Sequence, residues 1–316
     1  MISVAIQGGA MRSIYCLGAV RALVDKGLAP EVRSIHATSA GCVAGAVLAA
    51  KIATPEGLSV AEMGDLLLRE LQGNRFINLW RLRRIVDVNH LVDVIVKVTH
   101  VAPETFGDGG FTFEVALTDA KSGTAFYLDL SSARTADEVY QALVGTMAVP
   151  ILYPPRVRIG GRRYLDGGIT DPLPALRALR KNPQTLIAIS SVAKSNLGRE
   201  LEGRESLVVQ LLPVLPPQIR HLLLTRNPLG AAVEDLMDAT QVGGVRLVRI
   251  APLDQSRLGH RLETDRSKLA VLEEMGYADA MSALAGLGSE AQGEDATHPT
   301  DPDQAATTAQ AVSSGS

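Results

Sequence analysis

The strongest constraint on the fold is that short apolar strands alternate with helical segments along residues 1–284. Apolar runs and period-two alternation predict strands over residues 2–7, 32–37, 111–117, 124–130, 162–165, 185–191 and 245–250. Apolar residues at helical spacing predict helices over residues 13–26, 40–52, 58–71, 87–98, 135–146, 172–180, 230–239 and 265–284. Helices between strands favour parallel pairing, whereas Lys121-Ser122-Gly123 favours one antiparallel hairpin. We therefore expect an α/β protein whose mixed sheet lies between helical layers.

Composition places the chain among globular proteins. Its 316 residues are 46% hydrophobic and 21% charged, which allows a large buried core. The 31 basic and 34 acidic residues give a net charge of −3, so nucleic acid is not an expected partner. Cys16 and Cys42 are too few for a disulfide framework and lack zinc-site spacing, so both are expected to be buried thiols. The chain shows no signal-peptide pattern and no apolar run of about 18 residues, which predicts no transmembrane segment and, by default, a cytoplasmic protein.

The end of the chain differs in composition from the rest. Residues 286–316 contain no Lys, Arg, Ile, Phe, Tyr or Trp, and they include five acidic residues. A segment of this kind buries too little apolar area to offset its chain entropy. We therefore expect one folded domain over residues 1–284 and a disordered acidic tail over residues 285–316.

A glycine-rich turn, Gln7-Gly8-Gly9-Ala10-Met11-Arg12-Ser13, separates the first expected strand from the first helix. Glycine lets backbone N–H groups point outward at a helix N-terminus, where they bind negative charge. Dinucleotide binding is the alternative, but the second strand ends in His36-Ala37-Thr38 and offers no acidic residue for a ribose. The turn therefore favours a site for negative charge.

A serine lies between the second expected strand and the helix after it, in Ala37-Thr38-Ser39-Ala40-Gly41. Small residues two positions before and after a serine allow the tight strand–turn–helix that exposes a nucleophilic hydroxyl. The alternative is that Ser39 only caps the following helix. A nucleophile also needs a base, so the rest of the sequence decides between the two interpretations.

The base of such a nucleophile is not expected to be a histidine. An α/β-hydrolase places its serine well into the chain, followed by an acid and then a histidine, and Ser39 comes too early for that order. Each of the six histidines is better explained by a structural or surface role. Asp166-Gly167-Gly168 offers a carboxylate at the end of a strand, followed by a turn that allows close backbone approach. An ordinary Asp-Gly turn is the alternative.

In this order, the three segments resemble the patatin-like phospholipase family. That family has a glycine-rich segment near its N-terminus, a G-x-S-x-G elbow soon after it, and a later D-G-[GA] motif. Thr146-Met147-Ala148-Val149-Pro150, Tyr153-Pro154-Pro155 and Gly276-Tyr277 are similar to further family segments, so the resemblance covers about residues 4–280. It implies a three-layer α/β/α patatin-like fold with a mixed central sheet.

The resemblance also implies a Ser-Asp dyad, in which Ser39 is the nucleophile and Asp166 the general base. Backbone amides of an oxyanion hole are assigned to Gly8, Gly9, Ala10 and Met11. Residues expected to support the site are Arg12, Ala37, Gly41, Gly167 and Gly168. Ala10 and Ala37 replace family glycines, but Ala10 keeps its backbone N–H. No metal ion or cofactor is implied.

The expected function is that of a serine hydrolase which cleaves acyl esters of lipids, as a phospholipase A does, through an acyl-enzyme. A non-lipid carboxylesterase or thioesterase, or a catalytically silent lipid-binding module, is the alternative. Residues 74–84 mix arginines with Phe76 and Trp80, which suits peripheral contact with an anionic membrane. Their alternative is a loop that buries Trp80 and leaves the arginines in solvent. Residues 211–224 fit either a flap or ordinary helix packing.

Overall fold

The fold is given by a computed structural model that describes residues 1–72, 76–78, 85–106, 110–150, 152–153, 157–193, 215–225, 227–253 and 258–287. The chain divides into two units, Met1–Leu284 and Ala285–Ser316. Nearly all of the second unit lies outside the described residues. The domain boundary and the disordered acidic tail therefore stay predictions.

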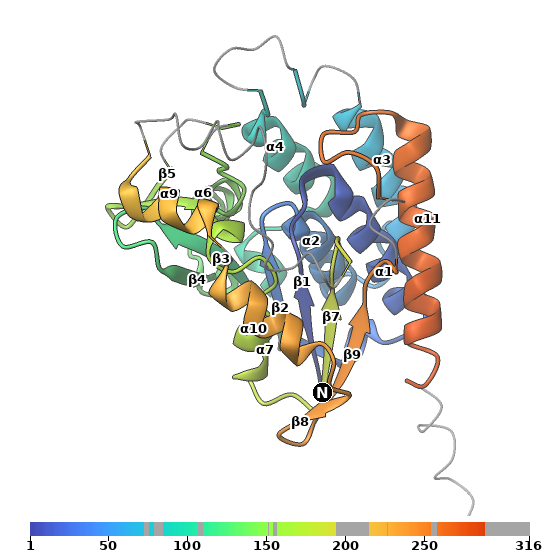
Figure 1. Cartoon of the computed structure of the whole chain (residues 1–316). Coiled ribbons are helices and arrows are strands. Elements are labelled where there is room, and N and C mark those ends of the chain that lie inside the picture. Colours follow the sequence, from blue (N-terminus) through green and yellow to red (C-terminus); the bar gives the residue numbers. More distant parts are fainter. Residues whose placement is uncertain are drawn as a thin grey trace, which may run out of the picture. The chain divides into compact units, whose positions relative to one another are not determined.

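The described residues of the first unit form one mixed sheet of nine strands (Figure 1). The strands are β1 (Ile2–Ile6), β2 (Val32–Thr38), β3 (Thr112–Asp119), β4 (Ala125–Asp129), β5 (Val157–Ile159), β6 (Arg162–Asp166), β7 (Thr185–Ile189), β8 (Gln241–Val242) and β9 (Val245–Ile250). β3, β2, β1, β7 and β9 are neighbours in that order and pair in parallel. β4, β5, β6 and β8 pair antiparallel. The mixed sheet and the β3–β4 hairpin are as predicted.

Two strands share one edge of β3 in succession. β2 pairs with β3 from Thr112 to Ala116, and β6 pairs with it from Leu117 to Asp119. β4 pairs with Glu114–Thr118 and so must take the opposite edge. β6 therefore begins pairing where β2 stops, and the ends of these two strands face each other. This arrangement brings together segments that are far apart in the sequence.

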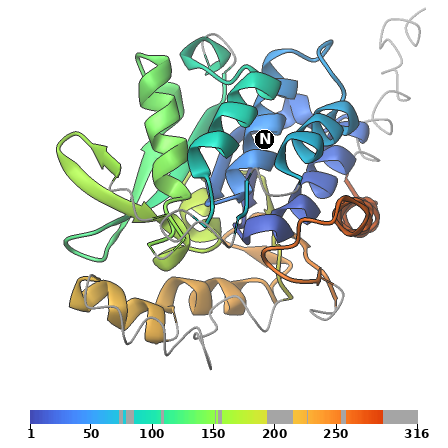
Figure 2. The ribbon, with the colours of Figure 1, turned by 90° about the horizontal axis from the view of Figure 1, so that it is seen from above.

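Helices cover both faces of the sheet, which confirms the predicted three-layer α/β/α fold (Figure 2). The larger layer contains α1 (Ile14–Asp25), α2 (Gly41–Ala53), α3 (Val60–Leu71), α4 (Val88–Thr99) and α6 (Ala136–Thr146), with α11 (Arg266–Ala283) against α1. The opposite layer contains α7 (Ala175–Leu179) and α10 (Pro228–Leu236), next to α9 (Pro217–Leu224). None of the helices within the described ranges is long and apolar enough to cross a membrane.

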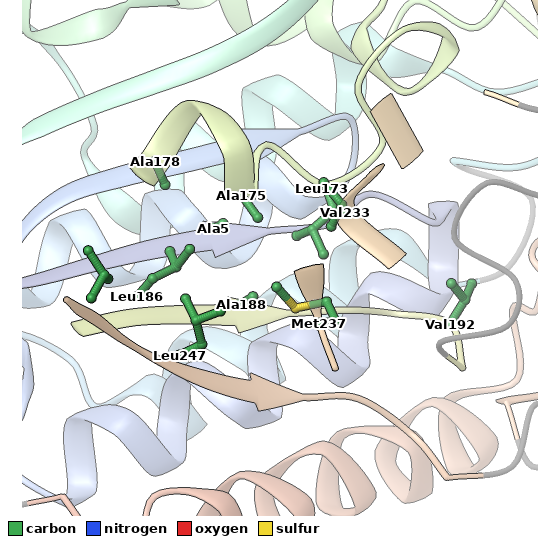
Figure 3. Close-up of a cluster of buried hydrophobic side chains, with 11 residues drawn as sticks. Ala5, Leu173, Ala175, Ala178, Leu186, Ala188, Val192, Val233, Met237 and Leu247 are labelled. Carbon is green, nitrogen blue, oxygen red and sulfur yellow. The ribbon is translucent and has the colours of Figure 1, made fainter. Parts of the chain in front are cut away.

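The smaller layer holds its own apolar core against the sheet (Figure 3). Ala5, Leu186 and Leu247 come from three neighbouring strands, and Ala175 and Val233 come from the two helices above them. Each of these side chains is less than 10% exposed. Burial of this kind stabilises by about 25 cal/mol per Å² of apolar surface, so it fixes α7 and α10 to the sheet.

α1 and α11, which lie far apart in the sequence, approach each other closely at two glycines. A Cβ on Gly18 of α1 would lie 1.9 Å from the Glu273 carbonyl oxygen of α11. A Cβ on Gly276 of α11 would lie 2.0 Å from the Tyr15 carbonyl oxygen. Only glycine at both positions allows this backbone contact, which explains why Gly276 interrupts an otherwise helix-forming segment.

The structure differs from the predicted elements mainly in short ones. It adds β5, β8, α9 and the four-residue α5 (Pro103–Phe106), and it begins the first helix with a 3₁₀ turn at Ala10–Ser13. Two- and three-residue strands carry too little periodicity to be recognised in sequence. α9 accounts for the end of the 211–224 segment, of which residues 211–214 lie outside the described residues.

Candidate active site

Ser39 lies immediately after β2 in a strained backbone conformation. Its φ angle is +52°, in the left-handed region that non-glycine residues rarely occupy. Its carbonyl oxygen accepts the Cys42 amide, which begins the turn into α2. A Cβ on Gly41 would lie 2.5 Å from the Gln7 carbonyl oxygen, so the turn needs glycine there to pack against the end of β1. This tight strand–turn–helix is the geometry expected of a nucleophile elbow.

Asp166, the last residue of β6, meets the Ser39 side chain. Ser39 Oγ donates to Asp166 Oδ2 at 2.6 Å, and the Gly168 amide donates to Oδ1 at 2.7 Å. The Asp166 side chain is buried, with 5% of the residue exposed. Burial raises its pKa from the ordinary 3.8 to about 6, against the opposing effect of these two hydrogen bonds. The carboxylate is thus a stronger base than one in water.

Glycine at position 167 allows the chain to turn directly beneath this contact. A Cβ on Gly167 would lie 2.2 Å from the Ala116 carbonyl oxygen on β3. The Asp166 carbonyl oxygen accepts the Thr118 hydroxyl at 2.8 Å, and the Asp166 amide donates to Ala148 at 3.0 Å. Both the amide and the carbonyl group of Asp166 are therefore hydrogen-bonded, which fixes the backbone that carries the carboxylate.

Thr146, at the end of α6, fixes the backbone of Ser39. Its hydroxyl oxygen accepts the Ser39 amide at 2.9 Å and donates to the Ala116 carbonyl oxygen at 2.6 Å. Thr146 is fully buried. No sequence motif assigns Thr146 a role, although it begins one of the segments similar to the family. Its contact with Ser39 depends on α6 packing against β3, which no local pattern reveals.

The glycine-rich segment lies against the serine. A Cβ on Gly8 would lie 2.6 Å from Ser39 Cβ and 2.8 Å from the Thr38 carbonyl oxygen. Within the described part of the chain, no hydrogen bond uses the amides of Gly8, Gly9 or Ala10. These amides are consequently available to an oxygen bound beside Ser39.

The next two residues bind a loop near the start of α11. The Met11 amide donates to the Arg261 carbonyl oxygen at 3.0 Å. That N–H is occupied, so Met11 differs from the other three residues predicted as oxyanion donors. Arg12 Nη2 donates to the Gly259 carbonyl oxygen at 2.6 Å, and Arg12 Nε donates to the same oxygen. Arg12 therefore stabilises the glycine-rich turn through Gly259. Within that turn, Ala10 adopts a left-handed conformation with a φ angle of +53°.

The buried histidine nearest in sequence to Ser39 serves a separate polar network. His36 Nδ1 lies 3.2 Å from Glu114 Oε2, and His36 Nε2 lies 3.1 Å from Ser34 Oγ. Arg177 of α7 and Lys181, which follows that helix, also pair with Glu114, and these partners hold the pKa of that carboxyl well below its usual range despite burial. Among the described residues, no group of three His, Cys, Asp or Glu side chains is placed to hold a metal ion.

The predicted membrane-contact segment is described only in part. Residues 76–78 are described, and Phe76 and Ile77 are each 5% exposed. Ile77 forms a bridge with Val86, and the Asn78 amide donates to Ile85. Trp80 and all the arginines of residues 74–84 lie outside the described residues. Peripheral contact through this segment stays a prediction.

We compared the chain with solved structures, with curated protein sequences and with models of protein families. The crystal structure of VipD from Legionella pneumophila is a structural neighbour with a TM-score of 0.42 and 12% sequence identity. The match covers 90% of this chain and 66% of the VipD chain. No curated protein sequence matches the chain. A family model for patatin-like phospholipase matches residues 4–179, which include Gly8, Ser39 and Asp166. Because that match covers more than half of the sequence, the chain belongs to the patatin-like phospholipase family.

Proposed function

We propose that this protein hydrolyses acyl esters of lipids through a Ser39–Asp166 dyad and an acyl-enzyme. The observation that carries the proposal is the 2.6 Å hydrogen bond from Ser39 Oγ to the buried carboxylate of Asp166. Family membership supports lipid acyl hydrolysis in general. The strained turn at Ser39 and the unused amides of the glycine-rich segment support an activated serine rather than a helix cap.

The reaction would proceed in two halves. Ser39 Oγ attacks the ester carbonyl carbon while its proton passes to Asp166 Oδ2, and the negative charge collects on the former carbonyl oxygen. The amides of Gly8, Gly9 and Ala10, which no hydrogen bond among the described residues uses, would bind that oxygen. The tetrahedral intermediate then expels the alcohol, which takes the proton from Asp166. Water repeats the same steps on the acyl-enzyme and releases the fatty acid.

The environment of Asp166 suits this cycle. A carboxylate with a pKa near 4 is a weak base for a serine hydroxyl, whereas burial raises the pKa of Asp166 to about 6. The carboxylate still ionises at neutral pH, so it can accept the proton in one step and return it in the next. Gly168 holds the second carboxylate oxygen and leaves Oδ2 directed at Ser39.

The first experiment is labelling with a fluorophosphonate, followed by mass mapping of the modified peptide. Wild type should carry the adduct on Ser39. Ser39→Ala should carry none, Asp166→Asn should react much more slowly, and Ser131→Ala, which alters a hydroxyl bonded to Asp129, should match wild type. No adduct on folded wild type, even with lipid vesicles present, would favour the silent lipid-binding module. An adduct on another serine would refute the dyad.

A second measurement separates a lipid hydrolase from an esterase or thioesterase of small substrates. Turnover of a phospholipid should rise sharply as its concentration passes the critical micelle concentration, because an interfacial enzyme acts on the assembled lipid. A rate that follows the dissolved monomer alone would favour the non-lipid esterase.

A further inference from the structure

A second buried serine, Ser191, contacts the same glycine-rich segment that lies against Ser39. Ser191 lies two residues beyond β7 and is fully buried. Its hydroxyl donates to the Gly8 carbonyl oxygen at 2.5 Å. A Cβ on Gly9 would lie 2.3 Å from Ser191 Oγ, so the hydroxyl fills the space above that residue. Two neighbouring glycines therefore contact the two serines, Gly8 against Ser39 and the Gly8 carbonyl and Gly9 against Ser191.

Because of peptide geometry, the hydrogen bond from Ser191 to the Gly8 carbonyl also orients the Gly9 N–H. The carbonyl of Gly8 and the amide of Gly9 belong to one planar trans unit, in which C=O and N–H point in opposite directions. A group that holds the carbonyl therefore also sets the direction of the N–H. Glycine on both sides leaves this unit free to rotate, since no side chain limits its dihedral angles. A hydrogen bond to the carbonyl is the restraint that the backbone itself lacks.

Ser191 is itself fixed by the end of β1. The Gln7 side-chain oxygen accepts the Ser191 amide at 2.9 Å and lies 2.6 Å from Ser190 Oγ. The Gln7 amide donates to Ile189 at 2.9 Å, so the strand ends are joined by backbone as well. Gln7 is 5% exposed, and its bonds are shielded from water. The hydroxyl therefore has one defined position relative to Gly8.

We propose that Ser191 is a positioning residue, which holds the Gly8 carbonyl and thereby aims the Gly9 amide at the oxyanion of the reaction. The inference rests on the proposed function, since it assigns Gly9 a role in binding that oxygen. The Ser191 hydroxyl donates to the Gly8 carbonyl oxygen, whereas the Ser39 hydroxyl donates to Asp166. The effect of Ser191 appears only when charge develops on the substrate oxygen, so it should alter kcat rather than substrate affinity.

The test compares Ser191→Ala with Ser191→Cys and with Ser3→Ala. Ser3 is a matched control, because it is also a buried serine, lies in β1 itself, and its hydroxyl is 2.6 Å from Ser34 Oγ of β2. The measurements are kcat and KM for a p-nitrophenyl ester and Ki for an aliphatic trifluoromethyl ketone. That ketone adds to the serine and places an oxyanion in the same site, so its affinity reports on the donors directly.

Ser191→Ala should lower kcat about tenfold to a hundredfold, somewhat less than the roughly 100- to 1,000-fold typical of losing a donor outright. KM should stay within about twofold, and Ki should rise by the factor that kcat/KM falls. Ser191→Cys, with a weaker donor of similar size, should lie between Ser191→Ala and wild type, and Ser3→Ala should match wild type. If Ser191→Ala does not fold, Ser191→Cys tests the proposal, because its kcat should fall and its Ki should rise together relative to wild type.

Two results would overturn the inference while leaving the proposed function intact. One is a kcat for folded Ser191→Ala or Ser191→Cys equal to that of Ser3→Ala. The other is a fall in kcat with no change in Ki, which would mean that Ser191 acts on something other than the oxyanion donors. Failure of the proposed function looks different, because wild type itself would neither turn over the ester nor take the fluorophosphonate on Ser39.

Discussion

Asp166 lies against Ser39 because β6 pairs with the same edge of β3 as β2 does, starting where the pairing with β2 ends. β2 pairs with β3 up to Ala116, and β6 pairs with β3 from Leu117 onward, so the two strand ends meet. The Ser39 hydroxyl and the Asp166 carboxylate are then 2.6 Å apart although 127 residues separate them in sequence. Both groups are held by backbone contacts to β3 and α6, which leaves their side chains little freedom to move apart.

Replacing the buried carboxylate should lower activity and raise stability together. Asp166→Asn keeps the size and can keep the bonds to Ser39 and Gly168, but it cannot accept the serine proton, so kcat should fall roughly 100- to 10,000-fold. The folded pKa lies above the ordinary value, so protonated Asp166 contributes stability that is fully present below about pH 4 and is lost as the pH rises through about 6. A shift from 3.8 to about 6 corresponds to roughly 3 kcal/mol.

At pH 8 Asp166→Asn should therefore unfold at a higher denaturant concentration than wild type, and at pH 4 the difference should shrink. Asp129→Asn, at the far end of β4 from the site, is the matched control and should show no change in kcat. A variant that loses stability at pH 8 would contradict the assignment of a raised pKa to Asp166.

The pH profile of kcat/KM should show a single fall on the acidic side, caused by protonation of Asp166. Asp166 must be ionised to act as a base, and burial raises its pKa to about 6. The value of kcat/KM should fall about tenfold per unit of pH below 6 and level off above about pH 7. Stopped assays across pH 4.5–8.5 would measure it, with protein stability checked at each point. A half-maximal rate near pH 4 would mean that the base is an ordinary exposed carboxylate or another group.

Thr146 should be needed for the strained turn. Thr146→Val has nearly the same shape but leaves the Ser39 amide and the Ala116 carbonyl without their buried partner, which costs about 1–3 kcal/mol. A serine displaced by about 1 Å loses on the order of 100-fold in rate. Thr146→Ser keeps the hydroxyl and should retain most of the activity. Equal kcat values for the Val and Ser variants would show that this hydroxyl does not position Ser39.

The glycine contact between α1 and α11 should govern stability without affecting chemistry. Gly276→Ala places a methyl group 2.0 Å from the Tyr15 carbonyl oxygen, and the two helices must separate. Overpacking of this kind typically costs about 1–3 kcal/mol, which lowers Tm by roughly 2–10 °C. Calorimetry would measure it, while kcat per site titrated with fluorophosphonate should stay at the wild-type value. Ala278→Gly, at an exposed position of the same helix, is expected to cost only about 1 kcal/mol.

The fold was largely predictable because most of its elements have strong local patterns. The predicted strand over residues 32–37 matches β2, and the predicted helix over residues 87–98 matches α4, each within about a residue. The Lys121-Ser122-Gly123 turn correctly indicated an antiparallel hairpin. Elements of two to four residues, such as β8 and α5, escaped prediction because tertiary contacts rather than periodicity create them.

By itself the sequence determined which residues were candidates for the chemistry. Gly8, Ser39 and Asp166 stand in turns whose small neighbours permit backbone conformations that other residues resist, and that requirement is local. Which of these groups meet depends on the order of the strands in the folded sheet. The shared edge of β3 joins Ser39 to Asp166, and the end of β7 brings Ser191 to the Gly8 carbonyl. Such contacts depend on strand order, and strand order is set by how the whole sheet buries its faces.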